Sequence, residues 1–371
     1  MNPANDEMYM ARALRLAERG LWTTDPNPRV GCVLVRDTEV VGEGWHEKAG
    51  EPHAEIHALQ QAGDRAAGAT AYVTLEPCCH HGRTPPCTDA LINAGVTRVV
   101  AAMRDPNPQV AGSGLLALQQ AGIETTDDVL AAEAEQLNAG FVMRMRSGRP
   151  HVRCKLAMSV DGRTAMASGE SQWITAAAAR RDVQRLRARS SAIMTGINTV
   201  LADDPSLTAR PDDLSEDDLA QPWRVVLDSR LRMPPAARLL GKPGRTLVLT
   251  GVTDIDRHAQ LMHANVEVVA LPLVDGRLDL AAVMQHLGAL EMNEVHLEAG
   301  AGLCGALLQA GLLDELVIYM APHLMGNAAR GLFDLPGLET LAQRVQLKIA
   351  DIRAVGEDWR ITATVANGNS V

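Results

Sequence analysis

Two stretches decide the fold of the first half of this chain, HAEIHALQQAG (residues 53–63) and LEPCCHHGRTPPCTDALINAG (residues 75–95). Within them, His53 and the two Pro-Cys pairs Pro77-Cys78 and Pro86-Cys87 occur in an order that suits a metal site. Zinc takes a tetrahedral set of nitrogen and sulfur ligands, and a catalytic zinc site keeps its fourth position for water. We therefore predict that His53, Cys78 and Cys87 bind Zn²⁺, which lowers the pKa of its bound water toward neutrality.

Glu55 is the candidate catalytic residue of this site. It follows His53 by two positions, so it can begin the same helix without being a metal ligand. A carboxylate in this place can carry the proton of the water to a departing amine. The order of these residues matches the signature of zinc deaminases, which is H-x-E followed by P-C-x-x-C.

One part of the chain departs from that signature, because eight residues and not two separate Cys78 from Cys87. The loop between them contains Gly82 and a Pro-Pro pair, which favour turns. Cys87 then opens a predicted helix, whose N-terminal dipole favours a thiolate. Cys79 directly follows Cys78 and is expected to point elsewhere as a spare thiol.

Two other kinds of metal site fit the pattern less well. His53 and His57 share a helix face, but a zinc protease has a glutamate where this chain has Ala54. We interpret His57 as a core residue or one that supports the site. In a non-enzymatic scaffold, a structural zinc is normally closed by four protein ligands. The fourth would then have to come from Cys79, His80 or His81.

The composition excludes several classes of protein. The 371-residue chain is long enough for two domains and has a net charge of −10. Residues 1–150 carry 13 basic and 19 acidic side chains, which argues against a nucleic-acid-editing deaminase. The N-terminus lacks the features of a signal peptide, and no stretch approaches 18 uninterrupted apolar residues. We expect no nucleic-acid partner, no membrane partner and a cytoplasmic location, where six cysteines stay reduced.

The first half alternates helices and strands. Helices are predicted over 8–20, 53–63 and 87–95, and strands over 30–35, 40–45, 69–77 and 96–103. The first two strands form a hairpin around Arg36-Asp37. The proposed zinc ligands therefore lie at two helix N-termini at one end of a sheet, which is the usual place for ligands in open α/β sheets.

A second α/β pattern begins after Ser-Gly-Arg-Pro at 147–150, which we interpret as a linker because Gly and Pro favour turns. Its apolar runs are typical of strands buried on both faces. Strands are predicted over 151–159, 191–196, 223–229, 246–251, 266–272, 294–300, 315–322 and 359–365. The acidic stretch 211–222 is expected to be an exposed, mobile insertion. The predicted domains are residues 1–147 and residues 151–371.

Two turns in the second half could hold a phosphate group. GAGLCG at 300–305 lies between a predicted strand and a predicted helix, where glycines let a backbone approach a pyrophosphate. The turn TGINT at 195–199 also follows a strand. The arginine-rich helix 175–190 is mainly a solvated face, but a phosphorylated substrate would need a guanidinium, and Arg187 and Arg210 are candidates.

Nearly the whole chain resembles one family, the bifunctional pyrimidine deaminase–reductase proteins of riboflavin biosynthesis. The matching segments occur in order from PNPRVGCVLV (26–35) to DELVIYMAP (314–322). The others are GEPHAEIHAL, YVTLEPCCHHGRTPPC, DPNPQVAGSG, KLAMSVDGRTA, SGESQWIT, TVLADDPSLTAR and EAGAGLCGALL. The long loop between the two cysteines is a feature of this family. GAGLCG differs from the expected GPTLAG-like form at three positions, among them Ala301 and Cys304.

The resemblance implies an α/β protein with an N-terminal cytidine-deaminase-like α/β/α domain and a C-terminal dihydrofolate-reductase-like α/β domain. The first would hydrolyse the amine of 2,5-diamino-6-ribosylamino-4(3H)-pyrimidinone 5′-phosphate with Zn²⁺. The second would reduce the ribosyl group of the product to ribityl with NADPH. The partner is thus a phosphorylated ribosylaminopyrimidine, and a homo-oligomer, with a dimer favoured, is expected.

The resemblance also implies site residues in the second domain. Those expected near the cofactor are Ala157, Trp173, Thr199, Asp203, Ser229, Gly300, Ala301, Gly302, Leu303, Cys304, Gly305 and Ala306. Those expected near the substrate are Ser171, Arg187, Leu207, Arg210 and Glu298. Lys155 and Asp161 lie in a matching motif with roles left open. We expect Lys155 to have a partner, because a lysine in an apolar strand is rarely fully buried without one.

Overall fold

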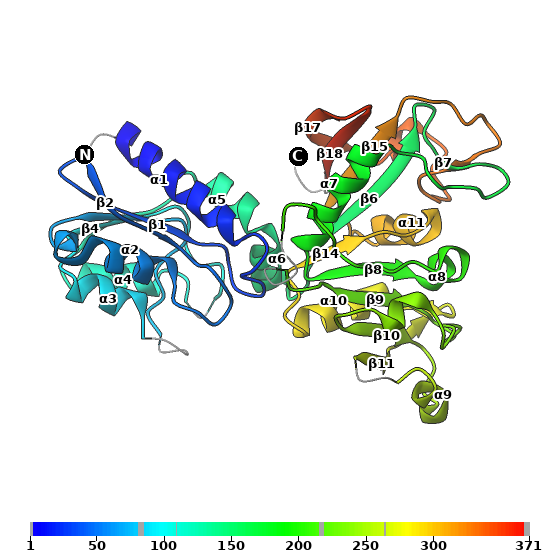
Figure 1. Cartoon of the computed structure of the whole chain (residues 1–371), viewed down its shortest axis with the longest axis horizontal. Coiled ribbons are helices and arrows are strands. Elements are labelled where there is room, and N and C mark those ends of the chain that lie inside the picture. Colours follow the sequence, from blue (N-terminus) through cyan, green and yellow to red (C-terminus); the bar gives the residue numbers. More distant parts are fainter. Residues whose placement is uncertain (1–2, 81–84, 109, 215–218, 263–264, 367–371) are drawn as a thin grey trace. The chain divides into compact units, whose positions relative to one another are not determined.

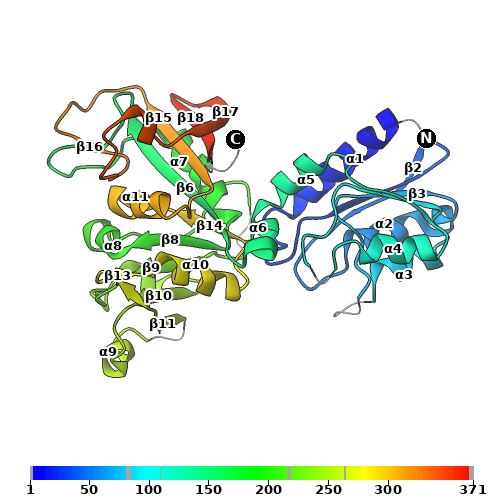
Figure 2. The ribbon, with the colours of Figure 1, turned by 180° about the vertical axis from the view of Figure 1, so that it is seen from behind.

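The chain forms two compact units, Met1–Gly148 and Arg149–Val371. The computed structural model describes residues 3–80, 85–108, 110–214, 219–262 and 265–366, and Figures 1 and 2 show the elements of each unit from two sides. No helix in these ranges is long and apolar enough to cross a membrane.

The first unit contains a five-stranded sheet in the order β2-β1-β3-β4-β5. The pairs β2-β1 and β1-β3 are antiparallel, and the pairs β3-β4 and β4-β5 are parallel. The strands are β1 (Gly31–Arg36), β2 (Glu39–Trp45), β3 (Thr70–Val73), β4 (Arg98–Ala101) and β5 (Glu124–Thr126). The helices are α1 (Pro3–Ala17), α2 (Ala54–Ala62), α3 (Cys87–Asn93), α4 (Ser113–Gln120), α5 (Ala131–Leu137) and α6 (Ala139–Ser147).

Helices cover both faces of this sheet. Buried side chains of α1, α5 and α6 pack on one face, and those of α2, α3 and α4 pack on the other. The predicted α/β/α layering is therefore confirmed. Two glycines of β2 let α2 approach closely, since a Cβ on Gly44 would lie 2.4 Å from the carbonyl oxygen of Ala54 and one on Gly42 would lie 2.2 Å from that of Ala58. This contact fixes the helix that begins directly after His53.

The second unit contains a nine-stranded sheet in the order β11-β10-β9-β8-β14-β6-β15-β18-β17. Neighbours from β11 to β15 are parallel, and β18 and β17 are added antiparallel at one edge. The strands are β6 (His151–Ser159), β8 (Ala192–Gly196), β9 (Trp223–Leu227), β10 (Thr246–Thr250), β11 (Val266–Ala270), β14 (Glu294–Leu297), β15 (Glu315–Ala321), β17 (Leu347–Val355) and β18 (Asp358–Val365).

Helices also cover both faces of this larger sheet, as expected for a mainly parallel sheet. Buried side chains of α10 (Leu280–Ala289) and α11 (Ala301–Gln309) pack on one face. The other face is covered by α7 (Ala177–Ala188), α8 (Ile197–Asp203) and the segment that follows β9. Short strands β7 (Arg163–Ala165) and β16 (Arg330–Gly331) pair beside the sheet. The α/β class predicted for this half is confirmed.

Some local predictions differ from the structure. The strand predicted over 69–77 ends at Val73, and the carbonyl end of β3 continues as an irregular segment toward Cys78. Strand β17 was not predicted, because a bulge between Ile349 and Asp351 breaks its alternation. The acidic stretch 211–222 is only partly exposed, since Leu219 is buried, and its residues 215–218 lie outside the described residues.

Candidate active sites

The candidate metal site of the first unit gathers three residues from separate segments. His53 precedes α2 with an extended backbone, Cys87 is the first residue of α3, and Cys78 lies beyond β3. The Nδ1 atom of His53 lies 3.6 Å from the Sγ atom of Cys78 and 3.3 Å from that of Cys87. All three ligand atoms lie within 4.8 Å of one another.

These separations suit a shared zinc ion. With a Zn–N bond of about 2.0 Å and a Zn–S bond of about 2.3 Å, tetrahedral angles place the nitrogen about 3.5 Å from each sulfur. The backbone N–H of Cys87 also donates to the Sγ atom of Cys78 at 3.3 Å, which stabilises a thiolate there. Among the described residues the group has three members, as in a catalytic site that leaves one position for water.

The protonation of the two thiols supports this interpretation. Hydrogen bonds from Cys87 and His53 outweigh burial and lower the pKa of Cys78 to about 4. The contact with Cys78, together with burial, raises the pKa of Cys87. Two thiolates in contact repel each other, so a divalent cation is the natural counter-charge for half-buried Cys78 and buried Cys87.

Glu55 lies beside the three ligands and is 3% exposed. Burial raises the pKa of its carboxyl group, and the side chain also interacts with the Cys87 thiol. A raised carboxyl pKa suits a group that takes up and releases a proton near neutral pH. His57 and Cys79 do not belong to the three-residue group, and Nε2 of His57 is buried under β2 without a hydrogen-bond partner.

The sequence did not reveal Glu76, which organises the backbone around the site. Its buried carboxylate accepts N–H groups at 2.8–3.2 Å from Asp105, Gly112, Gly114 and Leu115. The segment that contains these four residues is therefore hydrogen-bonded directly to the segment that carries Cys78. A glutamate within the apolar stretch 69–77, predicted as a strand, is the signal that could have indicated this role, since a buried carboxylate needs several donors.

His46 is a second supporting residue that the sequence did not indicate. Its ring packs edge-on against the His53 ring, with centroids 5.4 Å apart. Its Nδ1 atom lies 3.1 Å from the carbonyl oxygen of Pro52, and its Nε2 atom lies 3.1 Å from the side-chain amide of Asn27. These two contacts assign Nδ1 as the donor and hold the imidazole beside the site.

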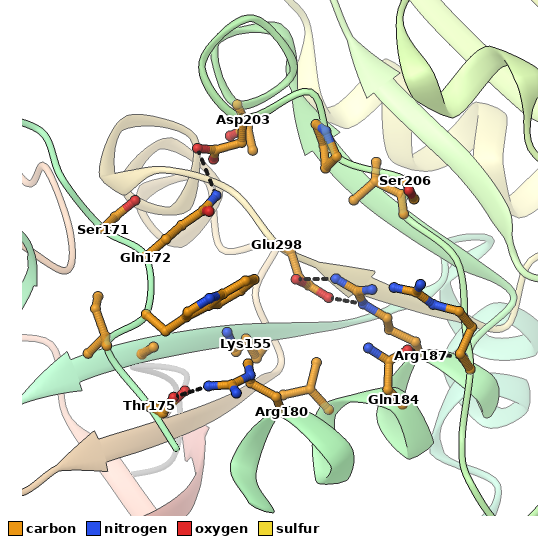
Figure 3. Close-up of a pocket in the computed structure, with 18 of the residues that line it drawn as sticks. Lys155, Ser171, Gln172, Thr175, Arg180, Gln184, Arg187, Asp203, Ser206 and Glu298 are labelled. Carbon is orange, nitrogen blue, oxygen red and sulfur yellow. Dashed lines mark hydrogen bonds and ion pairs between the residues drawn. The ribbon is translucent and has the colours of Figure 1, made fainter. Parts of the chain in front are cut away.

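Two cavities of the second unit, of about 580 Å³ and about 710 Å³, lie at the carboxyl ends of its central strands. Figure 3 shows the first cavity, with Glu298 and Lys155 at its floor and Arg187 entering from α7. Both cavities are lined by Lys155, Ala157, Ser171, Ile174, Thr199, Asp203 and Glu298. Because they share these residues, the two cavities adjoin, as sites for two reacting molecules must.

The predicted substrate residues lie together. Ser171, Arg187, Leu207, Arg210 and Glu298 all line the first cavity. Arg187 donates to both carboxylate oxygens of Glu298, at 2.5 Å and 2.9 Å. Burial opposes the charge on Glu298, but Arg187 outweighs it and holds the pKa of this carboxyl well below its usual range. Glu298 therefore presents a fixed anionic acceptor to the cavity.

The predicted cofactor residues divide into three groups. The largest group lines the second cavity and comprises Ala157, Thr199, Asp203, Gly300, Ala301, Gly302 and Leu303. Trp173 lines the first cavity, is 72% exposed and has the Arg180 guanidinium 4.9 Å from its ring. Four residues line neither cavity, namely Ser229, Cys304, Gly305 and Ala306. Gly305 instead lets α11 meet another segment, because a Cβ there would lie 2.0 Å from the carbonyl oxygen of Asp334.

Lys155 and Asp161 have different surroundings. Lys155 lines both cavities, and burial lowers the pKa of its ammonium group although Glu298 opposes this effect. Asp161 accepts the Ser159 hydroxyl and the backbone N–H groups of Met325 and Gly326, which lower its pKa to about 2. Asp161 thus joins the end of β6 to a neighbouring loop.

The fold and the two sites define a zinc-deaminase domain joined to a reductase domain, and comparison with known proteins agrees. The family model of the cytidine and deoxycytidylate deaminase zinc-binding region matches residues 3–103, and that of the RibD C-terminal domain matches residues 150–361. The riboflavin biosynthesis protein RibD of Escherichia coli K12 is 57% identical over 361 residues, which cover 95% of this chain and 97% of that protein.

Solved structures give the same result. Acinetobacter baumannii RibD superposes with a TM-score of 0.91 at 44% identity, covering 99% of this chain and 100% of that one. A diaminohydroxyphosphoribosylaminopyrimidine deaminase/5-amino-6-(5-phosphoribosylamino)uracil reductase from Thermotoga maritima gives 0.87 at 31% identity, covering 98% and 99%. The chain belongs to the RibD family of riboflavin biosynthesis proteins, and it is an enzyme with deaminase and reductase activities.

Proposed function

We propose that the first unit uses Zn²⁺ to deaminate 2,5-diamino-6-ribosylamino-4(3H)-pyrimidinone 5′-phosphate, and that the second unit uses NADPH to reduce the ribosyl group of the product. The end product would be 5-amino-6-ribitylaminouracil 5′-phosphate. The observation that carries the deaminase assignment is the open three-ligand group beside buried Glu55. The adjoining cavities that share Lys155 and Glu298 carry the reductase assignment.

In the first unit, His53, Cys78 and Cys87 would hold the metal. Bound zinc would make water nucleophilic near neutral pH. Glu55 would accept a proton from that water on its carboxylate and deliver it to the amine that leaves as ammonia. Burial of this carboxyl raises its pKa and thereby supports both transfers.

In the second unit, residues of the first cavity would bind the pyrimidine and residues of the second would bind the cofactor. Bound NADPH would supply the reducing equivalents for the ribosyl carbon. Glu298 would accept hydrogen bonds from hydroxyl groups of the sugar, and Lys155 would place its ammonium group between the two ligands. The cofactor turn at 300–303 would lie against the pyrophosphate at the start of α11, a helix of nine residues.

An assay with the full chain tests this proposal. Zinc-loaded protein should release ammonia from the diaminopyrimidine, and it should then oxidise NADPH in preference to NADH. The absence of an acidic residue about 20 positions after GAGLCG agrees with this preference. We also propose a cytoplasmic location and a homo-oligomer, most simply a dimer. Sedimentation of the purified chain would test the oligomeric state.

A further inference from the structure

The loop Leu207–Arg210, at the rim of the first cavity, is held by side chains at three successive residues. Arg187 donates to the carbonyl oxygen of Thr208 at 3.0 Å. Gln221 accepts the N–H of Ala209 at 3.0 Å and donates to its carbonyl oxygen at 2.8 Å. Gln184 accepts the N–H of Arg210 at 3.0 Å. A surface loop with this many side-chain contacts to its backbone is fixed before any ligand arrives.

Two further features show that the loop has one conformation. The backbone of Leu207 lies in the left-handed region, with φ of +46°, which a leucine adopts only when its surroundings impose it. The Leu207 side chain is 3% exposed and belongs to the apolar cluster under α8. The loop is thus anchored by the Leu207 side chain at one end and by Gln184 and Gln221 at the other.

The charges around the cavity distinguish Arg210 from the other arginines that line it. Arg187 is paired with Glu298, and Arg238 lies 3.7 Å from Asp204. Arg180 donates to the carbonyl oxygen of Thr175 and lies over Trp173. Arg210 is the arginine whose backbone is clamped while its guanidinium stays exposed at the rim, near Ser206. A guanidinium in that position is suited to a doubly charged phosphate ester, which it can contact through two N–H groups.

We propose that Gln184 and Gln221 are positioning residues that fix the 207–210 loop so that Arg210 binds the phosphate of the reductase substrate. This proposal rests on the reductase function proposed above. Gln221 lies outside both cavity linings, and Gln184 lines only the first, where it binds the backbone N–H of Arg210. Their effect comes through Arg210, because a receptor that is already ordered loses less conformational entropy when the ligand binds.

The test uses the full chain and compares two pyrimidines, the deaminated ribosylaminopyrimidine with its 5′-phosphate and the same compound without it. In the wild type, kcat/KM should be at least about a hundredfold higher with the phosphorylated compound. Gln221→Met and Gln184→Met keep the side-chain volume but remove the contacts. Each should raise KM for the phosphorylated compound about tenfold. Gln221→Met, whose side chain lies outside both cavity linings, should leave KM for the dephosphorylated compound and KM for NADPH unchanged.

A double-mutant cycle separates positioning from general stability. Arg210→Ala should abolish most of the discrimination, and Gln221→Met added to Arg210→Ala should cause no further loss, because both changes act on one contact. Gln309→Met is the matched control, since Gln309 also binds a backbone carbonyl, that of Pro336, but lines neither cavity. KM for NADPH monitors an intact second unit in every variant, because none of the substituted residues lines the second cavity.

The possible results are distinct. If the wild type fails to oxidise NADPH with both pyrimidines, the proposed function itself is wrong. If it does so but the glutamine variants keep the full preference for phosphate, the positioning proposal is overturned. It is also overturned if Gln221→Met and Arg210→Ala have fully additive effects on kcat/KM for the phosphorylated compound.

Discussion

At the residue scale, the proposed chemistry of the first unit depends on a division of roles between three candidate ligands and one carboxylate. His53, Cys78 and Cys87 meet around one point, while Glu55 lies beside them with a raised pKa. Glu55→Gln should keep stoichiometric zinc and lose deamination by about 10²–10⁴-fold, as removal of a general acid–base does. Metal analysis and an ammonia assay check this. Loss of zinc in the variant would show that Glu55 is a ligand.

The ligands themselves should respond differently from their neighbour. Cys78→Ser and Cys87→Ser should each lower zinc content, because a hydroxyl is a poor replacement for a thiolate on zinc. Cys79→Ser should retain the metal, since Cys79 lies outside the three-residue group. Elemental analysis of the three purified variants makes the comparison, and a zinc-free Cys79→Ser protein would refute this ligand set.

Lys155 makes a prediction about pH in the second unit. Burial lowers its pKa below the ordinary lysine value of about 10.4. A lysine with a lowered pKa is charged at low pH and loses its proton as the pH rises through that lowered value. Reductase kcat/KM should therefore fall as the pH rises, with a midpoint below about 10.4. Lys155→Met should remove this alkaline limb of the pH profile. The same limb in wild type and variant would assign the titration to another group.

At the scale of elements, Glu76 joins the loop 105–115 to the segment that carries Cys78. Glu76→Gln leaves buried N–H groups without an acceptor, each of which costs about 1–3 kcal/mol. We expect a loss of about 2–5 kcal/mol in the free energy of unfolding of the first unit, measured by urea denaturation. Glu133→Gln, on the exposed side of α5, is the control that should change stability by less than about 0.5 kcal/mol.

The elements also show what the sequence could predict. Amphipathic and apolar periods located α1, α2, α3 and the parallel strands, because these segments bury one or two complete faces. The sequence could indicate the proposed metal ligands because their spacing reflects the two helix starts. The partners of Glu76 and Gln221 could not be predicted, because each binds backbone groups that are 12 to 39 residues away and the sequence does not show which groups these are. Strand β17 was missed since its bulge hides the period of two.

At the scale of the whole molecule, the boundary between the units falls beside Gly148. Gly148 ends α6 with a φ of +67°, a conformation that glycine adopts easily. Arg149 belongs to the second unit, where its guanidinium donates to both oxygens of Asp314 at 2.8 Å. The domain start predicted at residue 151 omits this ion pair.

The two units should therefore be separable, and the residue at which the second fragment begins should affect its stability. A fragment of residues 149–371 should fold and reduce the deaminated substrate with NADPH, because its sheet and both cavities are made by its own residues. A fragment of residues 151–371 should be less stable by about 1.5–3 kcal/mol, since Asp314 loses a charged partner. Thermal or urea unfolding compares the two. Equal stability would remove this role of Arg149, and an inactive longer fragment would mean that the first unit completes the reductase.

The central claim is that one chain carries out two successive reactions on one phosphorylated pyrimidine. The most direct measurement supplies the diaminopyrimidine and NADPH to the full chain and counts ammonia released and NADPH oxidised. We expect a ratio of one to one for the zinc-loaded protein. Zinc-stripped protein and Glu55→Gln should form neither product from this substrate, yet oxidise NADPH when given the deaminated pyrimidine. Oxidation of NADPH without release of ammonia from the diaminopyrimidine would contradict the account.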